Sequence, residues 1–385
     1  MAKKSWLAHY TSKPASRRRF LQASAAGAAA SVLLAACGGS DSESDGGDRS
    51  GLITEPVDTS SQAKRGGVLL RNAEADPAGL DPHGGGATVA TFYEFAYARL
   101  FNYTPGYMEP STDALEGSVA ETFEWSSDMT TLTAKLRPNI RFHDLPPVGG
   151  RPMDIEDVLF SWRRFESQGS NRTVVANSAN PNAPIVSVQA TDANTLVIKF
   201  LEPLVYAQAY LAPRGYLTIV PKEAENTSVL DLRQRMLGTG PFMLRDYQQS
   251  VGLNFQRHAG FWDSERPYVD AIEYPIVSEY ATGLAQFRQG NIHWYEVRQE
   301  EVVRTKQELP HLNLYQGDIT IDTRRSIFGW QNEALRDKRV RQALSMSIDR
   351  DAWLDAQYNT DSFRTQGLPV ETRWNTALEA GENNN

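Results

Sequence analysis

Cys37 is the only cysteine of the 385-residue chain, and it lies where an Ala-rich run from Ala23 to Ala36 meets a polar, Gly-rich stretch. One cysteine cannot form an internal disulfide or supply the several thiolates of a structural metal site. Leu34 to Gly38 resembles a lipobox, in which small residues admit a signal peptidase and the cysteine thiol takes a diacylglycerol. A lone buried cysteine is the alternative, but no core is expected beside a polar stretch. We therefore predict that Cys37 is lipidated and becomes the mature N-terminus.

The residues before Cys37 indicate an export signal. They include no acid, and Ser16 to Gln22 resembles the twin-arginine translocation motif, with Gln22 where that motif usually has lysine. The candidate residues of this signal are Arg17, Arg18, Phe20 and Leu21. The apolar run is shorter than the about 20 residues of a membrane-spanning helix. We predict a twin-arginine-type lipoprotein signal peptide over residues 1–36, followed by a lipidated N-terminus and flexible linker over residues 37–65.

Sequence patterns that would mark an enzyme or a metal site are missing. The histidines are scattered, at His9, His83, His143, His258, His293 and His311. There is no G-x-x-x-x-G-K-[ST] phosphate loop and no G-x-S-x-G elbow, and Gly238 to Gly240 is best explained as a tight turn before a strand. Acidic side chains outnumber basic ones, 47 to 39, which disfavours a nucleic-acid partner. We expect no catalytic residue, no metal and no cofactor.

The elements that must position binding residues follow from hydrophobic periodicity and turn residues. Strands are predicted at 66–71, at 122–125 with 131–136, at 185–189 with 195–201, and at 242–247 with 251–257. Helices are predicted over 91–101, from Asp154 through Trp162, and over 337–349, with Asp154 and Asp157 serving as capping residues. Strands and helices mix without a strict βαβ repeat, which predicts an α/β or α+β body of several lobes.

Several separated motifs occur in an order that one protein family shares. They are Gly66 to Leu69 with Gly79 to His83, Leu136 to Asp144 followed by Asp154 to Ser161, Gly238 to Phe242, Ala259 to Trp262, and Arg339 to Arg350. Together they resemble the family 5 solute-binding proteins, the extracytoplasmic oligopeptide, dipeptide and nickel receptors of ABC importers. The resemblance is collinear from about residue 66 to residue 351.

The resemblance implies an α/β fold of the periplasmic-binding-protein type. This fold is a two-lobed, type II clamp with an extra subdomain, and it closes over its ligand by hinge motion. The first lobe is expected at 66–275, with the inserted subdomain at about 106–184, and part of the second lobe at 276–385. Family members continue beyond this length, so we expect a C-terminally truncated member whose second lobe is incomplete.

The same resemblance implies a receptor rather than an enzyme. It would deliver a peptide or similar small solute to the permease of an ABC transporter. Acylated Cys37 would hold it to the lipid bilayer, in the periplasmic space or on the outer face of the cell membrane. Two alternatives remain open, an exported hydrolase on the same scaffold and a nickel or metal-chelate receptor.

Two segments match regions that border the ligand cleft in the family. One is the loop after His83, with Gly84, Gly85 and Gly86, and the other is an expected strand over residues 328–332, with Trp330 and Asn332. The Trp330 indole would cover a ligand and the Asn332 amide would hydrogen-bond a peptide backbone. The alternatives are that Trp330 belongs to a core and that Asn332 caps the next turn. His83 is predicted to be a turn residue.

Overall fold

The structure of the protein is a computed structural model that describes residues 50–84, 90–106, 108, 111–112, 114–213, 216–315, 328–349, 352–353, 356, 363 and 365–368. The predicted signal peptide, Cys37, Gly85 and Gly86 lie outside these residues. Within the described part, no helix combines the length and the apolar character that crossing a membrane requires.

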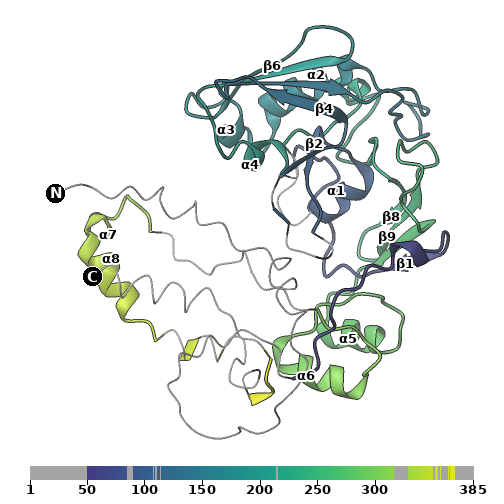
Figure 1. The fold of residues 1–385 in the computed structure, drawn as a ribbon, viewed down its shortest axis with the longest axis vertical. Helices are drawn as coiled ribbons and strands as arrows, with labels where there is room; N and C mark the ends of the chain where they lie inside the picture. Colours follow the sequence, from purple (N-terminus) through teal and green to yellow (C-terminus); the bar gives the residue numbers. More distant parts are fainter. Residues whose placement is uncertain are drawn as a thin grey trace, which may run out of the picture. The chain divides into compact units, whose positions relative to one another are not determined.

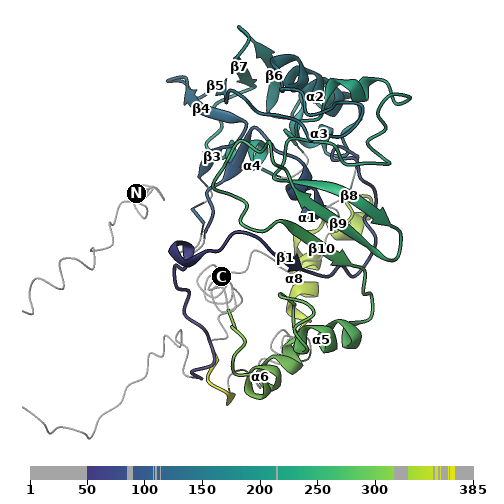
Figure 2. The ribbon, with the colours of Figure 1, turned by 90° about the vertical axis from the view of Figure 1, so that its right-hand side faces the viewer.

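One strand near residue 70 joins three consecutive strands of residues 242–275 in one mixed sheet, called here the first sheet (Figure 2). Its order is β1 (Val68–Leu70), β10 (Ala271–Pro275), β9 (Gly252–Arg257) and β8 (Phe242–Gln248). β1 and β10 run parallel, with Leu69 opposite Ile272, whereas the other two pairings are antiparallel. The strands predicted at 66–71 and at 242–257 are confirmed. The predicted bounds of the lobes and of the subdomain stay predictions.

α1 (Ala90–Ala96) lies beside the first sheet (Figure 2). Its aromatic side chains pack against that sheet. The ring centres of Phe92 and Tyr274 are 5.1 Å apart, and those of Phe95 and Phe255 are 5.5 Å apart. The helix ends at Ala96 and not at residue 101, so the predicted end is wrong. The reason is that residues 98–100 bond to residues 217–219 in an extended bridge, and residue 101 already opens a strand.

The close contact between α1 and the turn before β8 predicts a strong glycine requirement. A Cβ on Gly240 would lie 2.5 Å from the Ala96 carbonyl carbon and from the Phe95 carbonyl oxygen, which are backbone atoms that cannot swing away. We expect Gly240→Ala to lower the free energy of unfolding by about 3 kcal/mol, measured by denaturant unfolding. Gly79→Ala is the control, because a Cβ there meets nothing within 4 Å. Equal losses in the two variants would contradict this packing.

A second sheet is antiparallel throughout, in the order β4 (Ala120–Trp125), β5 (Thr131–Leu136), β7 (Thr195–Phe200) and β6 (Ile185–Ala190). On β5 and β7 every second residue is buried, as expected of strands with one face on a core. Both predicted hairpins of this region are confirmed. A short ribbon of β2 (Phe101–Tyr103) and β3 (Leu115–Gly117) precedes the sheet.

α2 (Ile155–Gln168) lies against the second sheet (Figure 1). Asp154 and Asp157 form a reciprocal capping box, each side chain accepting a hydrogen bond from the backbone N–H of the other residue. The predicted capping roles are therefore confirmed, and Trp162 on this helix is buried. Short helices follow at α3 (Arg172–Val175), α4 (Gln208–Leu211) and η5 (Lys222–Glu225).

The remaining elements are helical. They are η3 (Ser60–Gln62), α5 (Tyr280–Arg288), α6 (Gln299–Glu308), α7 (Glu333–Arg336) and α8 (Lys338–Met346). α8 confirms the predicted last helix, with Asp337 as its N-cap, although it ends at Met346 rather than at residue 349. Residues 328–332 form turn and coil instead of the expected strand, because their backbone leads directly into the cap of α7.

Candidate ligand-binding site

Gly84, the first of the three glycines predicted to border the cleft, ends a turn that begins at Asp81. Its N–H donates to the Asp81 carbonyl oxygen at 3.2 Å, and the residue is exposed. The His83 N–H donates to the Asp81 carboxylate at 3.0 Å. This turn therefore fixes the position of Gly84.

An ion pair with α2 anchors the same turn. Both carboxylate oxygens of Asp81 accept hydrogen bonds from Arg164, at 2.9 and 2.5 Å, and the Tyr93 hydroxyl donates to the Asp81 carbonyl at 2.7 Å. Burial alone would raise the pKa of Asp81. The hydrogen bonds and the charge of Arg164 outweigh burial, so this pKa lies below its ordinary value. Asp81 is thus a charged anchor for the turn that ends at Gly84.

His83 completes the anchor in a single tautomer. Its Nδ1 lies 3.0 Å from Arg164 Nη1 and its Nε2 lies 3.0 Å from the Thr218 carbonyl oxygen. A guanidinium only donates, so Nδ1 accepts and Nε2–H donates to Thr218. Burial, followed by the Arg164 charge, lowers the pKa of His83 to about 4. The prediction of a turn residue is confirmed, but sequence reasoning missed that this turn residue is buried and neutral.

Trp330 and Asn332 are both exposed. The Trp330 side chain is 66% exposed, which rules out the core alternative, and its ring centre lies 5.3 Å from the Arg341 guanidinium. Asn332 Oδ1 accepts from the Ala334 N–H at 3.1 Å, so Asn332 is the N-cap of α7. This agrees with the alternative that Asn332 caps the next turn. A Cβ added to Gly84 would first meet the Asp81 side chain, at 3.7 Å. The ligand roles of Gly84, Trp330 and Asn332 stay predictions.

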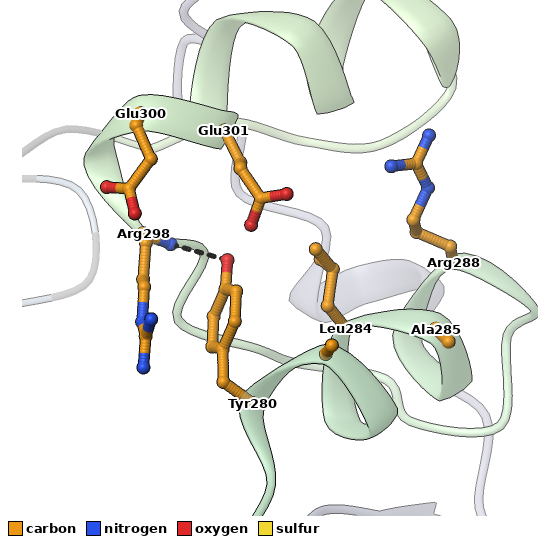
Figure 3. A pocket seen from close by; sticks show the side chains of 8 residues that line it. Tyr280, Leu284, Ala285, Arg288, Arg298, Glu300 and Glu301 are labelled. Atoms are coloured by element: carbon orange, nitrogen blue, oxygen red, sulfur yellow. Dashed lines mark hydrogen bonds between the residues drawn. The ribbon is translucent and has the colours of Figure 1, made fainter.

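An open hollow of about 490 Å³ lies between α5 and α6 (Figure 3). Leu284 and Ala285 line it beside Arg288 and Glu301. Tyr280 Oη accepts from the Arg298 N–H at 3.0 Å. Burial, and then the hydrogen bond with Glu301, raise the pKa of Tyr280 to about 12. The lining carries both signs of charge on an open surface, so it selects no class of ligand.

Sequence reasoning missed an arginine at the end of β1. The Arg71 guanidinium lies 4.4 Å from the Trp294 ring centre and 5.6 Å from the Tyr274 ring centre. Both distances are in the range of cation–π contacts. The available signal was period-two alternation, which puts Arg71 on the same face of its strand as the apolar Leu69.

The comparison with known families shows to which family the chain belongs. The profile described as bacterial extracellular solute-binding proteins, family 5 Middle, matches residues 114–384. The chain belongs to this family. The resemblance seen in the sequence motifs is thereby confirmed.

Curated relatives of this family 5 protein include peptide-binding proteins. The dipeptide-binding protein of Escherichia coli strain K12 is 26% identical over 349 residues, which is 84% of this chain and 61% of that protein. Di/tripeptide-binding protein 1 of Pseudomonas aeruginosa strain UCBPP-PA14 is 23% identical, over 80% of this chain and 58% of that protein. This family 5 protein thus spans about 60% of the length of these relatives.

Solved structures show the fold of this family 5 protein. The periplasmic binding protein DppA from Helicobacter pylori, in complex with the peptide STSA, superimposes with a TM-score of 0.62 at 21% identity. The match covers 78% of this chain and 60% of that one. MoaA of A. tumefaciens R10, in complex with mannopinic acid, gives a TM-score of 0.59 at 23% identity, over 77% and 57% of the two chains. These likenesses confirm the predicted α/β periplasmic-binding-protein fold of type II.

Proposed function

We propose that this protein is an exported, lipid-anchored receptor that captures a peptide or similar small solute and delivers it to the permease of an ABC transporter. The observation that carries the proposal is the family 5 match over residues 114–384. The two curated relatives above, named for dipeptides and for di- and tripeptides, support peptides as the solute class. Binding by a receptor needs positioned hydrogen bonds and enclosure rather than reacting groups.

The N-terminal sequence supports the part of the proposal that concerns export and membrane anchoring. Arg17, Arg18, Phe20 and Leu21 would direct export, and the Cys37 thiol would carry the diacylglycerol that holds the protein to the bilayer. The receptor would then work in the periplasmic space or on the outer face of the cell membrane. Its partners would be the solute, the permease and the lipid bilayer, with no nucleic acid.

Incubation of the full chain with a defined peptide mixture, followed by mass spectrometry of what is retained, tests the proposal. A receptor should retain intact peptide in a stoichiometric amount, and calorimetric titration with the retained peptide should give saturable binding. Multiple turnover of any component would instead favour an exported hydrolase. Stoichiometric bound nickel in the purified protein, with no retained peptide, would favour the metal-chelate receptor.

If Cys37 is lipidated, replacing its sulfur by oxygen should change the cell fraction in which the protein is found. Cys37→Ser removes the only thiol and should move the exported protein from the membrane to the soluble fraction, because two acyl chains give stable attachment. The measurement is membrane fractionation, together with the intact mass, which should lack the diacylglycerol. Gly38→Ala is the matched control, since it keeps the thiol and should stay on the membrane. Firm retention of Cys37→Ser would contradict the lipidation of this cysteine.

A further inference from the structure

Arg71 lies on the core face of the first sheet, at the edge strand. β1 is the outermost strand, and its pairing continues past residue 70, because the Arg71 N–H donates to the Glu273 carbonyl oxygen at 2.9 Å. Alternation along β10 leaves Glu273 exposed while Tyr274 is buried. The charge on Glu273 therefore lies on the opposite face from the Tyr274 ring, which Arg71 covers.

The Arg71 side chain has no hydrogen bond and no ion pair within the described part of the chain. Its Nε is buried without a hydrogen-bond partner, and so is the Tyr274 hydroxyl. Burying a guanidinium nitrogen and a hydroxyl without partners costs free energy, and each such group needs an explanation. By contrast, Arg137, which stacks on Trp262 at 4.0 Å, donates to the Ser118 carbonyl and pairs with Glu121.

The position of Arg71 is fixed before any ligand arrives. Residues 291–295 are tied to β1, because the His293 N–H donates to the Leu70 carbonyl at 2.9 Å and the Leu70 N–H donates to His293 Nδ1 at 3.2 Å. This connection holds the Trp294 indole over the guanidinium plane. The indole is 55% exposed, and Nε is the enclosed nitrogen of the group, so the fork of Arg71 reaches solvent at its two Nη atoms.

We propose that Arg71 is a binding site for the carboxylate of a solute, held in one plane by the rings of Trp294 and Tyr274. A guanidinium matches a carboxylate through two parallel hydrogen bonds, and stacking on rings fixes its orientation at little further entropic cost. The proposal deepens the proposed function and rests on it: the solute would be a peptide with a free carboxylate. Arg71 would thus recognise charge, while the contacts with the two rings would hold the guanidinium in place.

Calorimetric titrations of the full chain with alanyl-alanine and with its C-terminal amide test this site. Wild type should bind the free acid about ten- to a hundred-fold more tightly than the amide, as charge-assisted bidentate pairs predict. Arg71→Lys keeps the charge but loses the fork, so it should reduce this preference, and Arg71→Gln, which also loses the charge, should reduce it further. Trp294→Phe keeps a ring and should retain more of the preference than Trp294→Ala does.

Arg137→Lys is the matched control, because Arg137 is also stacked on an indole but already has protein partners. It should keep the full preference for the free acid. If Arg71→Lys fails to fold, as judged by thermal unfolding, Arg71→Gln takes its place. An unchanged preference in the folded Arg71 variant would overturn the carboxylate site and leave the receptor proposal intact.

A wild type that binds neither form of alanyl-alanine would count against the proposed function, and Arg71 is then tested separately with acetate. The Nε–H resonance of Arg71, assigned by its loss in Arg71→Lys, should shift saturably with acetate and not with acetamide. A resonance that responds to neither would overturn the site. So would a resonance already shifted by a carboxylate of the protein itself and insensitive to added acetate.

Discussion

Replacing Arg151 by methionine is expected to lower the free energy of unfolding by about 3 kcal/mol, because it leaves a buried carboxylate without its cation. The Asp157 side chain is 0% exposed, and its two oxygens accept from Arg151 Nη2 and Nη1 at 2.6 and 2.8 Å. The same guanidinium donates to both oxygens of Glu223, each at 2.7 Å. One side chain therefore connects the first turn of α2 to η5, and denaturant unfolding measures what that connection contributes.

Two further variants separate the buried charge from the loss of an ordinary ion pair. Arg233→Met is the matched control, because Arg233 forms the same kind of fork on Asp231 while 72% exposed, and exposed pairs contribute little. The double variant Arg151→Met with Asp157→Asn should recover part of the loss, since no buried charge is then left alone. Equal losses for Arg151→Met and Arg233→Met would show that burial of Asp157 does not set the effect.

Helices and strands that are determined by residues close together in the chain could be predicted from the sequence. The hairpins over 120–136 and 185–200 combine alternation with short turns, and the start of α2 has its capping residues within three positions of one another. The end of α1 could not be predicted. Apolar spacing continues to Leu100, but bonds to residues 217–219 extend the chain there, and no local pattern encodes a partner so distant.

In the candidate site, too, the local turn could be predicted, whereas the contacts between residues distant in the sequence could not. The sequence predicts His83 as a turn residue, but the anchor of this turn joins Asp81 to Arg164, 83 positions away in the sequence. Arg71 was overlooked because a charged residue after a short apolar run resembles an ordinary strand end. Its environment becomes apparent only in the fold, where the parallel pairing of β1 with β10 brings Tyr274 next to it and the hydrogen bonds between His293 and Leu70 bring Trp294.

Two buried histidines should make the folded protein less stable in acid. Burial, followed by the charge of Arg164, lowers the pKa of His83 to about 4, and burial, followed by the charge of His258, lowers that of His143 to about 3. His143 and His258 meet edge to face with ring centres 4.9 Å apart, and one nitrogen of each lies 3.1 Å from the Gly240 carbonyl oxygen. Burial lowers the pKa of His258 as well.

Stability should therefore fall as the pH falls below 6.5. Between pH 6.5 and pH 4 the unfolded chain takes up a proton at each histidine that the folded protein does not bind, so the stabilising contribution is complete above pH 6.5 and is lost toward pH 4. We expect a loss of about 3 kcal/mol from each of His83 and His143 over this window. Denaturant unfolding at a series of pH values measures it as a slope of up to about 1.4 kcal/mol per pH unit for each histidine.

His83→Gln and His143→Gln should each flatten this slope, whatever they do to stability at pH 7.5, because glutamine binds no proton in the unfolded chain. The slope rather than the absolute stability is the decisive quantity, since either variant also loses hydrogen bonds in the folded protein. Gly79→Ala changes no titratable group and should keep the slope of the wild type. A slope unchanged by both histidine variants would mean that other groups take up the protons, and that the turn before Gly84 does not depend on a neutral His83.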